Sequence, residues 1–283
     1  MNSPKEVAQN YIALGAAKTT YSIGRMFWLG VLAGMFIALA GTTSTISSAT
    51  LTGSAARIAA AVVFPGGLAM VLIAGSELFT GNTMILISVL EKQATWGGML
   101  KNWLVVYIGN LAGSVLIAAL VVFGHTFAKI VPDGMAGVMA IHTAVAKVNM
   151  TFLDAFYRGI LCNFLVCIAV WMSLAAKDAG GKIIALFFPI MFFVLNGWEH
   201  SVANMYYISA GLFASGTGAF TDAVAKAFPG DRLDTLTWGA FFVKNQLPVT
   251  LGNIAGGAVL VALIYWFVYL RADKKSGAPS GGK

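Results

Sequence analysis

Two short polar strings interrupt otherwise apolar stretches of this chain, and they match each other. Residues 75–82 read GSELFTGN and residues 197–204 read GWEHSVAN, so both follow Gly-x-Glu, four residues, Asn. A carboxylate and an amide at membrane depth are costly unless protein buries them or they line a wet cavity. Interruptions at corresponding positions of two halves indicate a transport site in a duplicated membrane chain.

The composition indicates a membrane protein. Of the 283 residues, 58% are hydrophobic and 10% are charged, whereas about a quarter are charged in soluble domains. Spanning a bilayer takes roughly 20 helical residues. Six apolar stretches qualify, at about 26–47, 58–90, 103–124, 158–176, 183–213 and 247–270. The second and fifth exceed one span and carry the polar strings, which predicts that helices 2 and 5 are broken at mid-membrane.

Positive charge predicts the orientation. Six spans would put both ends of the chain on one side of the membrane, and that side with its loops at 91–102 and 177–182 holds most of the 18 Lys and Arg residues. Because cytoplasmic loops carry this excess, we predict a multi-pass protein of the plasma (inner) membrane with both termini cytoplasmic. Membrane lipid is therefore an expected partner. Nucleic acid is not, because no basic run is interleaved with aromatic residues.

Further matches extend the repeat along the chain. Ala17-Lys18 and Ala146-Lys147 stand at the offset that also aligns the starts of the first and fourth stretches, and GNLAG at 109–113 matches GNIAG at 252–256. Three spans per half is an odd number, so the second half would be inserted upside down. The predicted fold is an all-α integral membrane protein with six transmembrane helices in an inverted 3+3 repeat.

The chain is predicted to divide into three parts. Residues 1–24 form a cytoplasmic N-terminal segment, 25–272 a six-helix transmembrane channel domain, and 273–283 a disordered cytoplasmic tail rich in Gly, Ser and Pro. The repeat halves cover about 15–124 and 144–272. Charged and amide side chains interrupt the N-terminal segment well before the first span, so it does not resemble a cleavable signal peptide.

Backbone groups that are freed at a helix break must find partners inside the protein. Glu77, Glu199, Asn82 and Asn204 are candidates for that structural role. His200 lies at the second break, and a histidine titrates near neutral pH and can donate to an anion. Half-helix N-termini add positive potential. His200 is therefore expected to contact the permeating solute.

Other residues around the breaks admit two interpretations each. Thr80 occupies the counterpart break and offers a hydroxyl donor and acceptor. Lys147 has no acidic neighbour close in sequence, and it either snorkels to the interface or draws anions to an outer vestibule, as Lys18 would on the other side. Large apolar residues either pack against helices and lipid or form constrictions that exclude water and ions; they are Phe64, Leu68, Leu78, Phe79 and Phe193.

An enzyme is not expected. Neither a His-Glu-x-x-His pattern nor a Gly-x-Ser-x-Gly elbow occurs, and Ser201 is a poor dyad partner for His200 because adjacent helical residues point apart. Cys162 and Cys167 lie in one apolar stretch without Cys-x-x-Cys spacing. No metal and no cofactor are predicted.

Together the motifs resemble those of the formate/nitrite transporter family, which includes formate, nitrite and hydrosulfide channels. The resemblance covers essentially residues 15–272. The matching segments are residues 77–82, 101–104 with 109–110, Lys147, 159–167 with 169–173, 197–205 and 248–253.

The resemblance implies six spans in an aquaporin-like inverted repeat, assembled as a homo-pentamer with one pore per protomer. It places a central histidine on His200, a loop threonine on Thr80 and an outer lysine on Lys147. The aquaporin Asn-Pro-Ala signature is absent, so the fold does not carry water selectivity with it. The implied constriction residues are Phe64, Leu68, Leu78, Phe79 and Phe193, and the implied supporting polar residues are Asn163, Glu199 and Asn253.

The predicted function is a pentameric channel or transporter for small monovalent anions or their conjugate weak acids, namely formate, nitrite or hydrosulfide. An ion entering a dry constriction faces a desolvation penalty of several kcal/mol, which the neutral acid largely avoids. Lys147 and Lys18 would gather anions, and the anion would take up a proton near His200 and Thr80. The alternative is a neutral-solute channel for water, ammonia or glycerol. The sequence leaves open the physiological anion, proton coupling, gating by residues 1–24 and whether His200 itself donates the proton.

Overall fold

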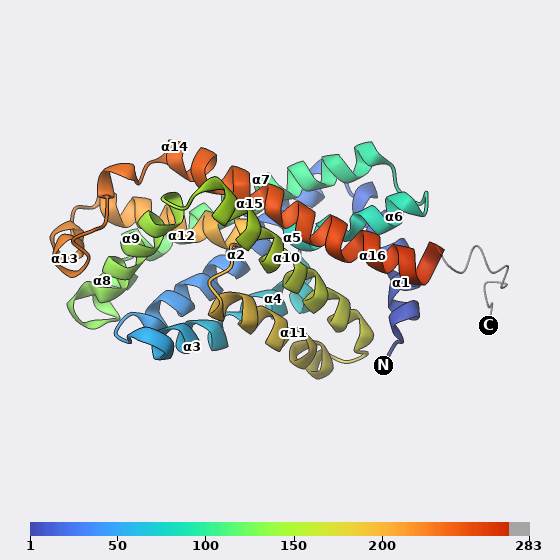
Figure 1. Ribbon diagram of the computed structural model, residues 1–283, viewed down its shortest axis with the longest axis horizontal. Coiled ribbons are helices and arrows are strands. Elements are labelled where there is room, and N and C mark those ends of the chain that lie inside the picture. Colours follow the sequence, from blue (N-terminus) through green and yellow to red (C-terminus); the bar gives the residue numbers. More distant parts are fainter. Residues whose placement is uncertain (272–283) are drawn as a thin grey trace.

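The computed structural model describes residues 1–271, and all regular structure in that part is helical (Figure 1). Among the described residues, five helices are long and apolar enough to cross a membrane. They are α2 (Ile23–Ser48), the helix Gly53–Gly75, α7 (Trp96–Phe123), α10 (Phe152–Ala175) and the helix Trp238–Arg271. Two shorter apolar helices are Phe79–Leu90 and α11 (Ala179–Leu195).

The remaining bounds complete the chain. The helix Gly53–Gly75 comprises α3 (Gly53–Val63), α4 (Pro65–Met70) and η1 (Val71–Gly75), and Phe79–Leu90 comprises α5 (Phe79–Asn82), η2 (Thr83–Ile85) and α6 (Leu86–Leu90). The last helix comprises α14 (Trp238–Ala240), η5 (Phe241–Gln246), α15 (Leu247–Ile254), η6 (Ala255–Leu263), α16 (Ile264–Trp266) and η7 (Phe267–Arg271). Elsewhere lie α1 (Pro4–Thr20), α8 (Thr126–Lys129), η3 (Pro132–Gly134), α9 (Met135–Val148), α12 (Ser201–Gly216), α13 (Thr221–Ala227) and η4 (Leu233–Thr235).

Both helix breaks fall on the matched polar strings. The helix Gly53–Gly75 ends at Gly75 with φ +83°, and α11 is followed by Gly197 with φ +67°. Glycine adopts positive φ angles without steric cost. The next helix then begins after Leu78 (φ −107°, ψ 120°) or His200 (φ −107°, ψ 116°). The two breaks therefore have nearly the same backbone path. The fifth apolar stretch is divided into α11 and α12, each too short to span alone, so six spans stay a prediction.

Glycines let the long helices cross closely. A methyl group added to Gly113 of α7 would overlap the Val31 carbonyl of α2, and one on Gly252 of α15 would overlap the Phe156 carbonyl of α10. Small residues at such crossings let membrane helices pack backbone against backbone. Asparagine side chains on α7 and α15 are thereby brought within reach of the breaks.

We expect Gly113→Ala to destabilise the protein by about 1–3 kcal/mol, because the α2–α7 crossing must open to admit the methyl group. Thermal unfolding in detergent measures the effect. The matched control is Gly97→Ala in the first turn of the same helix, where an added Cβ meets no atom within 4 Å. That control should be neutral or stabilising by up to about 1 kcal/mol. Equal stability of the two variants would contradict the close crossing.

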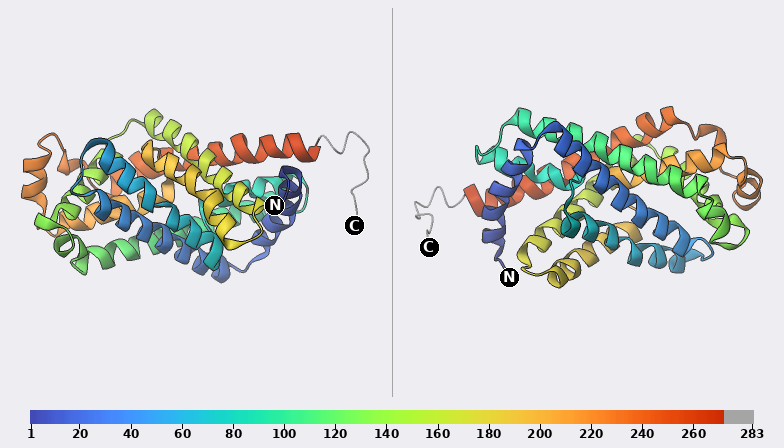
Figure 2. Two further views of the ribbon diagram at one scale, coloured as in Figure 1. Left: turned by 90° about the horizontal axis from the view of Figure 1, so that it is seen from below. Right: turned by 180° about the vertical axis from the view of Figure 1, so that it is seen from behind.

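The parts outside the long helices are structured too. In α1, Ser3 and Glu6 form a reciprocal cap, and hydrogen bonds from the Ser3 backbone and hydroxyl lower the pKa of the Glu6 carboxyl. The N-terminus and the end of the last helix lie at one end of the molecule, and α8 and α13 lie at the other (Figure 2). At that far end, His142 Nδ1 lies 2.8 Å from Asp231 Oδ2.

Candidate functional site

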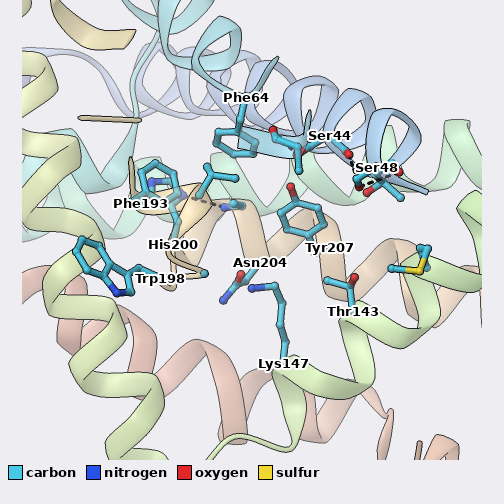
Figure 3. Close-up of a pocket in the computed structure, with 16 residues that line it drawn as sticks. Ser44, Ser48, Phe64, Thr143, Lys147, Phe193, Trp198, His200, Asn204 and Tyr207 are labelled. Atoms are coloured by element: carbon cyan, nitrogen blue, oxygen red, sulfur yellow. Dashed lines mark hydrogen bonds between the residues drawn. The ribbon is translucent and has the colours of Figure 1, made fainter. Parts of the chain in front are cut away.

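Two cavities approach the breaks and share no lining residue. The α9 cavity, of about 190 Å³, is lined by Phe64, Phe193 and His200 together with Lys147 from α9. Figure 3 shows Lys147 reaching into this cavity from α9, with His200 and the two phenylalanines at its inner part. The α1 cavity, of about 390 Å³, includes Leu68, Leu78, Glu77 and Lys18 of α1 in its lining.

Large apolar side chains border each cavity. The rings of Phe64 and Phe193 meet edge to face with centroids 5.7 Å apart, and Phe193 stacks on the His200 ring at 5.8 Å. Leu68 and Leu78 line the α1 cavity, and they are 2% and 4% exposed. Four of the five predicted constriction residues therefore border a cavity. An apolar barrier of these residues, which stays a prediction, would penalise any charged solute.

Phe79 is placed differently from the other predicted constriction residues. It lines neither of the two cavities. Its ring packs edge to face against Trp103 and Tyr107 of α7, with centroids 6.2 and 5.1 Å away. This packing fixes the backbone next to Thr80, while a part in the constriction stays a prediction for Phe79.

His200 and Thr80 are in contact next to Phe193. The Nε2 atom of His200 lies 2.9 Å from the hydroxyl oxygen of Thr80, and both residues are buried. The backbone N–H of Ala203 donates to His200 Nδ1 at 3.0 Å. Because Nδ1 accepts a hydrogen bond, the neutral ring must carry its proton on Nε2. The ring therefore donates from Nε2 toward the Thr80 hydroxyl, at the point that joins the two breaks.

Each break also holds a buried ion pair. Lys18 Nζ donates to Glu77 Oε1 at 2.7 Å and to Asn82 Oδ1 at 3.0 Å. Lys147 Nζ donates to Glu199 Oε1 at 2.8 Å and to Oε2 at 3.0 Å. Both carboxylates are bonded mainly by side chains and not, as their place in the sequence predicts, by freed backbone groups of the break.

Asparagines extend the two ion pairs in the same way. Asn82 Nδ2 donates to Glu77 Oε2 and to Asn102 Oδ1, at 2.7 and 2.9 Å, while Asn102 Nδ2 donates to the Lys18 carbonyl at 3.1 Å. At the other break the equivalent bonds run from Asn204 to Glu199 (2.6 Å) and Asn245 (2.9 Å), and from Asn245 to the Lys147 carbonyl (3.0 Å).

The freed backbone groups are bonded by asparagines of the long helices instead. Asn110 Oδ1 accepts from the Phe79 N–H at 2.9 Å, and its Nδ2 donates to the carbonyls of Gly30 and Glu77. Asn253 Oδ1 accepts from the Ser201 N–H at 2.9 Å, and its Nδ2 donates to the carbonyls of Gly159 and Glu199. The same three kinds of bond therefore hold both breaks.

Asn163 joins the two halves of the site. Its Nδ2 donates to the Thr80 carbonyl at 3.1 Å, to the Thr83 hydroxyl at 3.2 Å and to the Asn253 carbonyl at 2.6 Å. The predicted supporting residue thus orients the backbone that carries Thr80.

Asn102 and Asn245 are two residues of this site that were not predicted from the sequence. A signal was present, because Asn102 precedes Asn110 by eight residues and Asn245 precedes Asn253 by the same eight. Eight residues are close to two helical turns, so each pair lies on one face of its helix, toward a break.

Comparisons with known proteins identify the family of the chain. The family model described as "Formate/nitrite transporter" matches residues 5–267. The chain is 35% identical to a "Probable formate transporter" of Methanothermobacter thermautotrophicus, over 95% of this chain and 97% of the relative. It is 36% identical to "Formate channel FocA" of Escherichia coli (strain K12), over 95% of each chain.

Solved structures show the same likeness. A "Pentameric formate channel with formate bound" matches with a TM-score of 0.76 and 34% identity, covering 88% of this chain and 98% of that one. An "FNT family ion channel" matches with a TM-score of 0.79 and 28% identity, covering 93% and 98%. With its apolar helices and its two matched breaks, the chain is a multi-pass membrane protein that belongs to the formate/nitrite transporter family.

Proposed function

We propose that the protein is a homo-pentameric channel that passes small monovalent anions or their conjugate weak acids, such as formate, nitrite or hydrosulfide. Each protomer would hold one pore, which runs from the α1 cavity to the α9 cavity past His200 and Thr80. The contact of these two side chains between the cavities carries the proposal. The names of the relatives support the substrate class, and the pentameric formate channel supports the assembly.

We further propose six spans in an inverted repeat, with both termini cytoplasmic in the inner membrane. The repeat is supported by the equivalent bonds of Asn110 and Asn253 and by the two lysine–glutamate pairs. The orientation rests on the excess of Lys and Arg toward the end that carries α1. In this arrangement the α1 cavity faces the cytoplasm.

The lysines would attract the anion to each mouth. An ammonium group has three N–H donors, and the bonds of Lys18 and Lys147 to their neighbours use two of them. The third donor remains for an anion in the cavity. Because each lysine is neutralised by a buried carboxylate, it holds the anion weakly enough for release, which rapid passage requires.

The proton would come from water in the cavity and not from His200. In the neutral ring Nδ1 already accepts from Ala203, so loss of the Nε2 proton would create an imidazolate anion beside an apolar barrier. A doubly protonated ring would set Nδ1–H against the Ala203 N–H. His200 instead offers an Nε2–H hydrogen bond to the incoming anion. This bond and the half-helix N-termini hold the solute while it is neutralised.

Apolar side chains then favour the neutral acid over the anion. The barrier of Phe64, Phe193, Leu68 and Leu78 offers no charged partner, so the neutral form crosses at a much lower desolvation cost. The family of the chain does not favour the neutral-solute alternative for water, ammonia or glycerol.

Flux into proteoliposomes tests this function, with formate, nitrite, hydrosulfide, chloride and glycerol compared across about pH 5 to 8, where histidine and weak-acid chemistry act. We expect the weak-acid anions to cross selectively and faster toward acid pH, because protonation precedes passage. Protein-free liposomes and a Gly97→Ala variant serve as controls. Comparable flux of glycerol or chloride that is indifferent to pH would refute the proposal.

A further inference from the structure

The two cavities differ in charge. The charged residues that line the α1 cavity are Lys18, Arg25, Lys182 and Glu77, whereas Lys147 alone does so in the α9 cavity. Lys18 is paired with Glu77, and Lys147 is paired with Glu199. The α9 cavity is therefore close to neutral, while Arg25 and Lys182 leave the α1 cavity with two positive charges.

Neither of these two cations has an acidic partner among residues 1–271. Within residues 1–271, the ion pairs of the protein involve other side chains. The Arg25 guanidinium lies over the ring of Tyr21, 3.9 Å from its centroid, and this ring also lines the cavity. Stacking on an aromatic ring holds a guanidinium in place and leaves its N–H donors free.

Their positions in the helices are unfavourable without a ligand. Arg25 is the third residue of α2, and Lys182 is the fourth residue of α11. Both lie at the positive end of a helix dipole, where a cation is disfavoured and an anion is stabilised. The excess of positive residues on the cytoplasmic side explains their presence there, but it does not require them to share one cavity.

The shape of the cavity limits what can bind. Its volume of about 390 Å³ is within the range of small-molecule sites, about 300–1,000 Å³. Leu14, Leu72 and Leu174 supply apolar walls, and Leu68 and Leu78 of the proposed barrier line the same cavity. An anion with a compact apolar body and two negative charges matches both the walls and the two cations, and it is too wide for the apolar barrier.

We propose that the α1 cavity is a binding site for a divalent organic carboxylate, held by Arg25 and Lys182, which blocks the pore from that side. The inference rests on the proposed function only for the block, because binding itself needs no transport. Each negative charge is attracted by both cations, so a divalent anion gains about twice the attraction of a monovalent anion with the same body. The site therefore separates blockers from permeating anions by charge.

Binding to the purified pentamer in detergent tests this, with phthalate as the divalent probe and benzoate as its monovalent counterpart. We expect phthalate to bind at least about tenfold more tightly than benzoate, a difference of about 1.4 kcal/mol in binding free energy. The double variant Arg25→Gln/Lys182→Gln should remove that preference. The matched control is Lys101→Gln, a cation on the same side that does not line the α1 cavity.

Formate flux separates this inference from the proposed function. Without phthalate, the double variant should retain flux within about threefold of wild type, and phthalate inside the vesicle should inhibit only pores whose α1 cavity faces inward. Equal affinity of phthalate and benzoate, or a preference that survives the double variant, would overturn the site. Phthalate binding without any formate flux would instead count against the proposed function alone.

Discussion

Replacing His200 with phenylalanine should reduce formate flux by about 10- to 100-fold, since a hydrogen bond to a charged group contributes roughly 1.5–3 kcal/mol. The substitution removes the Nε2–H donor at the Thr80 contact, where the anion would be held while it is neutralised. The residual flux should depend on pH more steeply than in the wild type, because only acid that is already neutral in bulk water can then enter the barrier. Flux into proteoliposomes between about pH 5 and 8 is the measurement.

A second variant separates this effect from damage to the fold. His200→Asn keeps a side-chain oxygen that can accept the Ala203 N–H, because asparagine is a good N-cap, but it lacks the donor at the position of Nε2. It should fold like wild type and still lose most flux. The matched control is His142→Phe, because His142 pairs with Asp231 and lines neither the α1 cavity nor the α9 cavity, so flux should be unchanged. A wild-type pH profile in either His200 variant would contradict the protonation site.

The largest loss of stability is expected from Lys147→Met. It would leave the Glu199 carboxylate, whose side chain is 5% exposed, without its cation. Removing one partner of a buried ion pair costs about 3–5 kcal/mol, because an uncompensated charge stays buried. Thermal unfolding of the purified protein in detergent measures this loss, and Lys101→Gln at the surface is a suitable reference.

Neutralising both partners should restore the fold but not the function. In Lys147→Met/Glu199→Gln no uncompensated charge remains, and the amide can still accept from Asn204, so most of the stability should return. Flux at low formate concentration should stay reduced, because the α9 cavity has lost the ammonium that attracts the anion. If the single variant were as stable as wild type, the pair of Lys147 and Glu199 would not contribute to stability. If the double variant carried wild-type flux, Lys147 would have no part in attraction.

The sequence predicted the breaks because their chemistry is costly. Buried carboxylates such as Glu77 and Glu199 in apolar stretches need a local reason, and the structure places both at a helix interruption. The two ion pairs were not predicted from the sequence, because Lys18 is 59 residues from Glu77 and Lys147 is 52 residues from Glu199. Helical periodicity relates only near neighbours, so contacts between separate helices lie beyond it.

Side-chain direction was harder to predict than position. Phe79 and Leu78 are adjacent in the same break, yet Leu78 borders a cavity whereas Phe79 packs on α7. The roles of Asn102 and Asn245 depend on helix crossings that only the folded chain defines. Hydropathy predicted six stretches, and the polar string at 197–204 predicted the interruption of the fifth, which lies between α11 and α12.

The hydrogen bonds that hold each break come mostly from its own half of the chain. Phe79 is held by Asn110, and Ser201 is held by Asn253, while the contact of Thr80 with His200 crosses between the halves. A substitution in one break therefore leaves the bonds of the other intact. The two halves can therefore diverge in sequence wherever they are not in contact. A new solute preference can arise from substitutions around the contact of Thr80 with His200, while the bonds that hold each break are kept.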